Sequence, residues 1–220
     1  MKKILWLAVT ALLAIANVQA QVPAEVKQVM EKCNAAMTPA AGMEYHMEAK
    51  TSMGPVSLMT MNIVMGSKGD KERSLVTTKV VGKEVVFEAG YDGSMSWERQ
   101  QMPNSRDSII ISTGKKEGGG DDLVDLGLCD EFKKAKMKEK DDYYDITFSD
   151  PKDKDSELKS ISLKVSKKNY LLREMRTGMK GARVVMTFTK YKVGLKDDYF
   201  KLDFTKYPNA VIVRKQAESK

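Results

Sequence analysis

The side chains best suited to acid–base or nucleophilic chemistry are few in this sequence. It contains one histidine, His46, between Glu44 and Glu48, and two cysteines, Cys33 and Cys129. A histidine beside carboxylates could act as a base or a metal ligand, and Cys33 with His46 could form a nucleophilic pair. However, His46 lies on the polar side of an alternating segment, and Cys33 lies on an apolar stripe at helical spacing, where a thiol is unreactive. We therefore interpret His46 as solvated and reject the Cys–His pair.

Other polar patterns give no stronger sign of catalysis. The glycine run 118–120 could surround a phosphate, but it lacks a Gly-Lys-Ser/Thr ending and precedes Asp121 and Asp122, which would repel an anion. The remaining carboxylates cluster in segments of turn composition and are interpreted as solvated. One His and two Cys also leave little material for a metal site. We expect a protein that is not an enzyme and that uses no metal or cofactor.

Methionine is the unusual component, with 15 among 220 residues. Met59, Met61, Ile63 and Met65 alternate along one segment, so in a strand they would share a face. Flexible thioethers suit a cavity that accepts variable apolar ligands, and they equally suit a core in which Met replaces Leu. The composition leaves both interpretations open.

The overall composition is that of one soluble domain, with 42% hydrophobic and 30% charged residues. The formal net charge of +7 is a mild excess. The densest basic run, Lys133–Lys140, is flanked by carboxylates, so we interpret it as a solvated helix face and expect no nucleic-acid partner. Cys33 and Cys129 could form one disulfide in an exported protein, although nothing in the sequence fixes their separation.

The first twenty residues have the three-part layout of a secretory signal peptide. Lys2 and Lys3 precede an apolar run, and small residues, Val18 and Ala20, precede the expected cleavage before Gln21. The apolar run is about 13 residues long, shorter than the ~20 residues that a spanning helix needs. We expect one soluble exported domain over residues 21–220.

Hydrophobic periodicity predicts the elements that position these residues. Three- and four-residue spacing predicts an amphipathic helix over Val22–Met37, ended by Thr38-Pro39. From Met43 the period becomes two, and turn signals such as Asp92-Gly93 separate about eleven strands. These strands are predicted near residues 43–50, 56–65, 73–81, 84–91, 94–99, 107–112, 142–149, 157–166, 170–177, 182–193 and 210–214.

A second helix is predicted between the two groups of strands. After the glycine-rich connector, Asp121 or Asp122 can cap a helix that runs to about Lys140. Its apolar side chains would pack on one face of the sheet. The number of strands suits a strongly curved sheet or a barrel.

The order of these elements resembles the LolA-like family of periplasmic outer-membrane lipoprotein carriers. The hairpin Tyr91-Asp-Gly-Ser-Met-Ser-Trp97 is similar to one in the family, and segments 157–165, 168–174 and 184–191 are similar to its sequential C-terminal strands. Leu195–Asp203 followed by Tyr207–Val211 is similar to its ending, with Asn209 in place of a glycine. The likeness covers nearly all residues after the predicted signal peptide, and the order of the motifs is its stronger signal.

The resemblance implies a mainly β fold with α: an unclosed antiparallel β-barrel covered by lid helices. Its apolar interior would shelter acyl chains of lipoproteins in the periplasm. The implied partners are an inner-membrane donor and an outer-membrane acceptor, and the expected state is a monomer. The family has an Arg-Pro step whose Arg is implicated in lid control. Here the Pro is missing, and Arg73 is the corresponding residue to consider.

A physical argument supports such a carrier independently. Each buried CH₂ is worth about 0.8 kcal/mol, so a ~16-carbon chain represents roughly 12 kcal/mol and does not cross water unaided. Lid helices on a glycine hinge could open for release. If each strand keeps one register, the predicted cavity is lined by Met59, Met61, Ile63, Met65, Val85, Phe87, Met95 and Trp97 from the sheet and by Leu123, Leu126 and Phe132 from the lid.

A second class of function stays open at this point. The same curved sheet with a filled core would be a non-enzymatic protein-interaction or sensor module that recognises a polypeptide by edge-strand addition. A hydrolase would need a catalytic constellation, for which the sequence gives no support. Lipid-sized adducts on the purified protein would favour the carrier.

Overall fold

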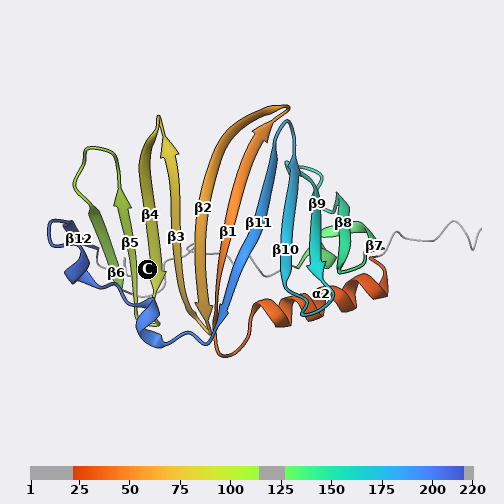
Figure 1. The fold of residues 1–220 in the computed structure, drawn as a ribbon, viewed down its shortest axis with the longest axis horizontal. Coiled ribbons are helices and arrows are strands. Elements are labelled where there is room, and N and C mark those ends of the chain that lie inside the picture. The colour runs from red at the N-terminus through yellow and green to blue at the C-terminus, as the bar shows by residue number, and fades with distance from the viewer. Residues whose placement is uncertain (1–21, 114–126, 216–220) are drawn as a thin grey trace, which may run out of the picture.

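The computed structural model describes residues 22–113 and 127–215. Most of these residues belong to one twelve-stranded sheet that is not closed, with a helix against it (Figure 1). The expected fold class, an unclosed β-barrel with helical cover, is therefore confirmed. The predicted signal peptide and the predicted lid residues Leu123 and Leu126 lie outside the described residues.

The chain crosses the sheet as two meanders that meet in the middle. The order is β12-β6-β5-β4-β3-β2-β1-β11-β10-β9-β8-β7, and neighbours are antiparallel except for the parallel pair of β12 and β6. The strands are β1 (Met43–Met53), β2 (Val56–Lys68), β3 (Lys71–Val80), β4 (Lys83–Tyr91), β5 (Met95–Gln101), β6 (Ser108–Thr113), β7 (Phe132–Glu139), β8 (Tyr143–Pro151), β9 (Leu158–Ser166), β10 (Leu172–Met179), β11 (Arg183–Val193) and β12 (Val211–Lys215).

Helix α2 (Ala24–Met37) covers one half of one face of the sheet. It follows Pro23, and it ends where the Thr38 hydroxyl donates to the carbonyl of Asn34 at 2.8 Å. Its apolar stripe is buried: Val26, Val29, Met30, Cys33 and Met37. In the described ranges, no helix combines the length and the apolar character needed to span a bilayer.

The predicted second helix is wrong from Phe132 onward. Helix α3 (Leu128–Glu131) is a single turn, and β7 follows it directly. Within β7, Ala135 and Met137 are half-buried, whereas the lysines between and beside them are exposed. This period of two, with lysines outward, is typical of an edge strand, and β7 is the last strand of the sheet. Phe132 is therefore a core residue, 6.0 Å from Phe148 between ring centroids.

We call the side of the sheet that carries α2 the helix face. Cross-strand register assigns residues to it: Tyr45 pairs with Met65, and Met47 pairs with Ile63. Below α2, strand β1 and strands β8–β11 fill this face with large buried side chains, including Met47, Phe148, Leu163, Met175 and Phe188. This half of the helix face is thus occupied by the protein's own core.

The segment after β11 covers the opposite face. It forms the short 3-10 helices η1 (Asp197–Phe200) and η2 (Phe204–Lys206) before β12. Trp97 packs there with Ile109, Ile111 and Leu202, and its indole N–H donates to the carbonyl of Phe200 at 3.2 Å. Helix α2 therefore covers half of the helix face, and the C-terminal segment covers the opposite face.

Candidate functional site: a pair of pockets over strands β3 to β6

Small side chains replace bulky ones on the helix face of β3–β6. One register row runs from Met65 through Ser74, Ala89 and Glu98 to Ile110. The row beside it, toward the β3–β4 turn, contains Ile63, Val76, Phe87, Gln100 and Ser108. Because Ser and Ala occupy central positions, the sheet is not filled here as it is beneath α2.

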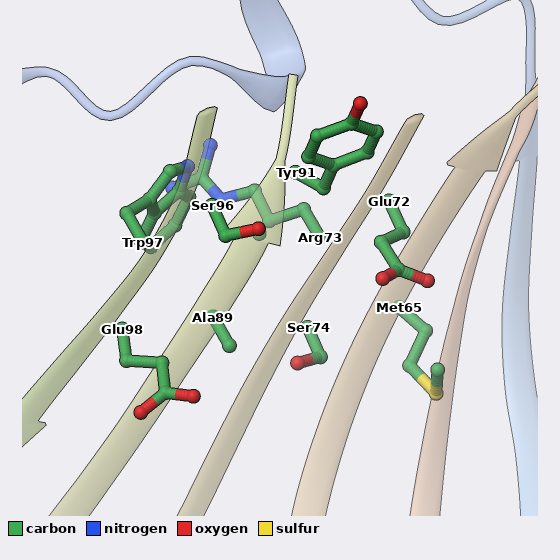
Figure 2. A pocket seen from close by; sticks show the side chains of 10 residues that line it. Met65, Glu72, Arg73, Ser74, Ala89, Tyr91, Ser96, Trp97 and Glu98 are labelled. Atoms are coloured by element: carbon green, nitrogen blue, oxygen red, sulfur yellow. The ribbon is translucent and has the colours of Figure 1, made fainter. Parts of the chain in front are cut away.

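Two adjoining pockets occupy this region and share Ser74, Ala89 and Glu98. The Phe87 pocket has a volume of about 310 Å³ and is lined by Ser74, Val76, Phe87, Glu88, Ala89, Glu98, Arg99, Gln100, Ser108 and Ile110. The Glu72 pocket is smaller, about 60 Å³, and is lined by Met65, Glu72, Arg73, Ser74, Ala89, Gly90, Tyr91, Ser96, Trp97 and Glu98 (Figure 2).

Both pockets combine apolar and polar lining. Val76, Phe87 and Ile110 give the Phe87 pocket apolar walls, and its volume lies at the lower end of the range for small-molecule sites. In Figure 2 the carboxylates of Glu72 and Glu98 lie at the Glu72 pocket with the hydroxyl of Ser74. Glu98 lines both pockets, so a ligand that spans them would meet apolar walls and carboxylates together.

Six of the predicted lining residues lie on the helix face, as the register shows: Met59, Met61, Ile63, Met65, Val85 and Phe87. Of these, Met65 and Phe87 line the pocket pair. Ile63 and Met65 also pack against the core. Met61 is half-buried, and Met59 is exposed.

The prediction that Met95 and Trp97 line the cavity from the helix face is wrong, because both residues belong to the opposite face of β5. Trp97 pairs with Gly90 in the row of Arg73, whereas Glu98 pairs with Ala89 in the row of the pockets. A one-residue change of register reverses the face of every side chain in a strand. Trp97 lines the Glu72 pocket, but its main packing is with the opposite-face cluster, as is that of Met95.

The sequence interpretation missed the small and polar lining residues, above all Ser74, Val76, Ala89 and Glu98. Val76 and Ile110 are apolar residues of predicted strands and could have been found from alternation. The alignment of Ser74 with Ala89 depends on cross-strand register, which only the three-dimensional pairing defines.

Arg73 lies on the opposite face, in a buried ionic cluster. Its Nε donates to Glu88 Oε1 at 3.0 Å, and Nη1 donates to the carbonyl of Tyr199 at 2.8 Å. Arg99 Nε and Tyr207 Oη donate to Glu88 Oε2 at 2.9 and 3.1 Å. These contacts tie β3, β4 and β5 to the C-terminal segment.

The carboxylate of Glu88 is the centre of this cluster and is 3% exposed. Burial alone would raise its pKa, but hydrogen bonds and charge from Arg73 and Arg99 outweigh burial and lower the pKa. The guanidinium of Arg73 also lies over the rings of Trp97 and Tyr199, 5.6 and 5.4 Å from their centroids. The contacts of Arg73 support a clamp on the C-terminal segment, and its expected lid role stays a prediction.

His46, Cys33 and Cys129 do not line the pocket pair. His46 is partly exposed, and its Nε2 lies 3.0 Å from Glu44 Oε1. Cys33 is buried, and burial raises the pKa of its thiol to about 12. Cys33 and Cys129 are both free thiols. Within residues 22–113 and 127–215, no three His, Cys, Asp or Glu side chains are grouped as a metal site.

Solved structures share this fold at low sequence identity. An uncharacterised conserved protein from Thermus thermophilus matches with a TM-score of 0.53 and 7% identity, over 87% of this chain and 99% of that one. The lipoprotein LppX from Mycobacterium tuberculosis matches with a TM-score of 0.52 and 11% identity, over 78% of this chain and 97% of that one. A LolA superfamily protein from Nitrosomonas europaea matches with a TM-score of 0.37 and 13% identity, over 81% and 98%.

No protein-family model matches the sequence, and no curated protein matches it. The fold expected from the sequence is confirmed as a likeness of fold to LppX and to the Thermus thermophilus protein. Identities this low show the fold alone.

Proposed function

We propose that this protein is a non-enzymatic carrier that holds the acyl chain of a lipid or lipoprotein in the pocket pair. The observation that carries the proposal is the Phe87 pocket of about 310 Å³ on a part of the helix face that the core does not fill. The chain would lie along Val76, Phe87 and Ile110.

The energetics fit carriage followed by release. Burial of each CH₂ is worth about 0.8 kcal/mol, so a few methylenes in the Phe87 pocket stabilise the complex by several kcal/mol. Binding also costs translational freedom and the ordering of a flexible chain. A site that shelters part of an acyl chain therefore gives the moderate affinity that handover to a partner requires.

The predicted signal peptide supports a place of action in the periplasm. There the carrier would receive acyl chains from an inner-membrane donor and deliver them toward the outer membrane. Transfer between two surfaces needs reversible binding and no chemical step.

A substitution pair on β3 tests the proposal. Val76→Asp introduces a charge into the Phe87 pocket, whereas Thr77→Asp introduces the same charge at the next residue, on the opposite face and also half-buried. Affinity for a fluorescent fatty acid is expected to fall at least about tenfold in the first variant, because burying an uncompensated charge is costly. It should change little in the second.

Native mass spectrometry of the wild-type protein provides the second readout, with lipid-sized adducts expected. Absence of adducts together with absence of fatty-acid uptake would overturn the carrier proposal. Equal affinity in the wild type and the Val76→Asp variant would remove the Phe87 pocket from the site.

One observation favours the interaction module as a second candidate. Strand β12 is first in the sheet order, so one of its edges has no neighbouring strand among the described residues. All five of its residues are exposed, including Val211, Ile212 and Val213. Such an edge can pair with an extended peptide. Peptide binding that Ile212→Pro abolishes, without lipid uptake, would favour this function.

A further inference from the structure

Three hairpin turns lie at the same end of the strands, at the top of Figure 1. They are Gly54-Pro55 between β1 and β2, Val81-Gly82 between β3 and β4, and Lys180-Gly181 between β10 and β11. Their six strands are consecutive in the sheet. We call the residues at these turns, 50–60, 79–84 and 180–183, the hairpin rim.

The hairpin rim exposes large apolar side chains. Met53, Val56 and Leu58 of the first hairpin and Val80 and Val81 of the second are each at least half exposed. Single exposed hydrophobic residues are ordinary on protein surfaces, whereas a group of them on neighbouring turns marks an interaction surface.

The tip of the β3–β4 hairpin is held in an unfavourable backbone conformation. Val81 and Gly82 have φ values of 51° and 76°, the two positive angles of a type I′ turn. Asn or Gly suits the first position, and a β-branched residue there is an outlier. Because the Val81 side chain is 96% exposed, packing within the protein does not explain its presence. Strain that packing does not explain points to function.

Positive charge surrounds the apolar tips. The rim segments contain five exposed cations, Lys50, Lys79, Lys83, Lys180 and Arg183, against one carboxylate, Glu84. Lys50 also pairs with Glu48 at 2.7 Å, just outside the rim. Apolar tips flanked by Lys and Arg are the arrangement that binds the interface of an anionic bilayer.

We propose that the hairpin rim docks onto the surface of an anionic lipid bilayer. Val80, Val81, Met53 and Leu58 enter the interface, and the flanking cations bind the headgroups. The inference rests on the rim alone and does not depend on what the pocket pair holds. Docking would bring the Phe87 pocket, which β3 lines at residues 74 and 76, nearer the membrane than the Glu72 pocket at residues 72–74.

Vesicle sedimentation tests the proposal with the exported protein, every variant having the same N-terminus. Vesicles of phosphatidylcholine are compared with vesicles of phosphatidylcholine and phosphatidylglycerol, at low and at high salt. Binding is expected with the anionic vesicles and should weaken several-fold at high salt, because salt screens the cations.

Val81→Asn separates docking from folding. Asn adopts the left-handed region readily, so the midpoint of thermal unfolding should stay the same or rise. The affinity for anionic vesicles should fall about threefold to tenfold through loss of the apolar tip. Val193→Asn is the matched control, because Val193 is 57% exposed at the other end of β11. Its vesicle affinity should equal that of the wild type.

The outcomes distinguish this proposal from the carrier function. No binding of the wild type to anionic vesicles, or equal vesicle affinity in the wild type and Val81→Asn, would overturn membrane docking even if fatty acid enters the pockets. Vesicle binding that Val81→Asn weakens would support it even if fatty-acid uptake fails. Capture of a protein that depends on Val81, without vesicle binding, would make the rim a protein interface and overturn the bilayer proposal.

Discussion

Tyr199 stands directly over Gly66, so that an ideal Cβ at residue 66 would overlap Cε1 of the tyrosine ring. This contact places the C-terminal segment against β2, near the middle of the sheet. The ring of Trp97 lies similarly close over Gly90, with 2.6 Å between its Cζ2 and an ideal Cβ. In the register row Gly66–Arg73–Gly90, two glycines make room for rings on either side of the Arg73 side chain.

Gly66→Ala should therefore destabilise the fold by about 1–3 kcal/mol, the usual cost of forcing an extra methyl group into a packed contact. Urea unfolding measures this loss. Gly127→Ala is the control, because an ideal Cβ there meets nothing within 4 Å; its stability should stay within about 0.5 kcal/mol of the wild type. Stability of Gly66→Ala equal to that of the control would mean that Tyr199 moves aside without cost.

Glu88 should make stability depend on pH in the acidic range. Its folded-state pKa is below the ordinary value of 4.5, so the ionised carboxylate stabilises the fold above about pH 4.5. That contribution is lost as the pH falls through the folded-state pKa. Glu88→Gln removes the carboxylate shared by half-buried Arg73 and buried Arg99, of which Arg99 keeps Asp107 at 3.1 Å, and should cost about 3 kcal/mol at pH 7. Because Gln does not titrate, the difference from the wild type should shrink on acidification.

Urea unfolding at pH 7, 5 and 3.5 tests this prediction. Glu84→Gln, an exposed substitution on the same strand, is the control and should have little effect at any of these values. A constant difference between wild type and Glu88→Gln across the series would contradict the assigned role of the charge.

Arg73→Lys tests whether Arg73 holds the C-terminal segment in place or controls a lid. Lysine keeps the charge but lacks the planar fork that reaches Glu88 and the Tyr199 carbonyl together. We expect amide hydrogen exchange in residues 197–202 to become roughly tenfold faster as this segment opens more readily. Affinity for the fluorescent fatty acid should change less than twofold. The reverse pattern, with altered affinity and unchanged exchange, would support the lid role.

The two thiols should differ in reactivity. Cys33 is fully buried with a pKa of about 12, and Cys129 is half-buried with a pKa raised mainly by burial. Iodoacetamide at pH 8 should alkylate Cys129 slowly and Cys33 only after unfolding. Intact-mass measurements follow both reactions. Resistance of both cysteines in urea without reductant would instead reveal a disulfide.

Met61→Asp tests whether the site continues beyond the pocket pair toward the β3–β4 turn. Met61 lies on the helix face, paired with Ala49 and Thr78. If acyl chains extend along this row, a carboxylate there should lower fatty-acid affinity about tenfold while circular dichroism stays native-like. Asn62→Asp, the exposed neighbour that faces the other way, is the control. Unchanged affinity would limit the site to the two pockets.

Period-two alternation was sufficient to predict most of the sheet. The segment Met43–Lys50 alternates so regularly that its buried face could be assigned before any partner was known. Strand β7 was missed because a lysine-rich segment after an acidic N-cap signal also suits a helix. Its alternation, Lys134-Ala-Lys-Met-Lys138, was the available signal of an edge strand.

Which face Trp97 occupies was not predictable from its strand. An indole in an alternating segment can lie on either face of a sheet. Trp97 is buried by Phe200 and Leu202, which come about a hundred residues later in the chain. The pockets were only partly predictable for a related reason. Phe87 and Met65 are apolar and were expected to line a cavity. Ser74 and Ala89 leave room for the pockets because their side chains are small, and this effect is recognisable only when the neighbouring residues are known.

The pairing of β1 with β11 has a consequence for how the chain matures. Strand β1 cannot complete its pairing until β11 has been synthesised, because Met43 of β1 pairs with Val193 of β11 in the middle of the sheet. During synthesis from the N-terminus, β1 has β2 on one side and an unsatisfied edge on the other until the last long strand emerges. An exposed edge of this kind invites pairing between chains. Correct folding should therefore depend either on a chaperone that protects this edge or on fast pairing of β11 with β1 once β11 has been synthesised.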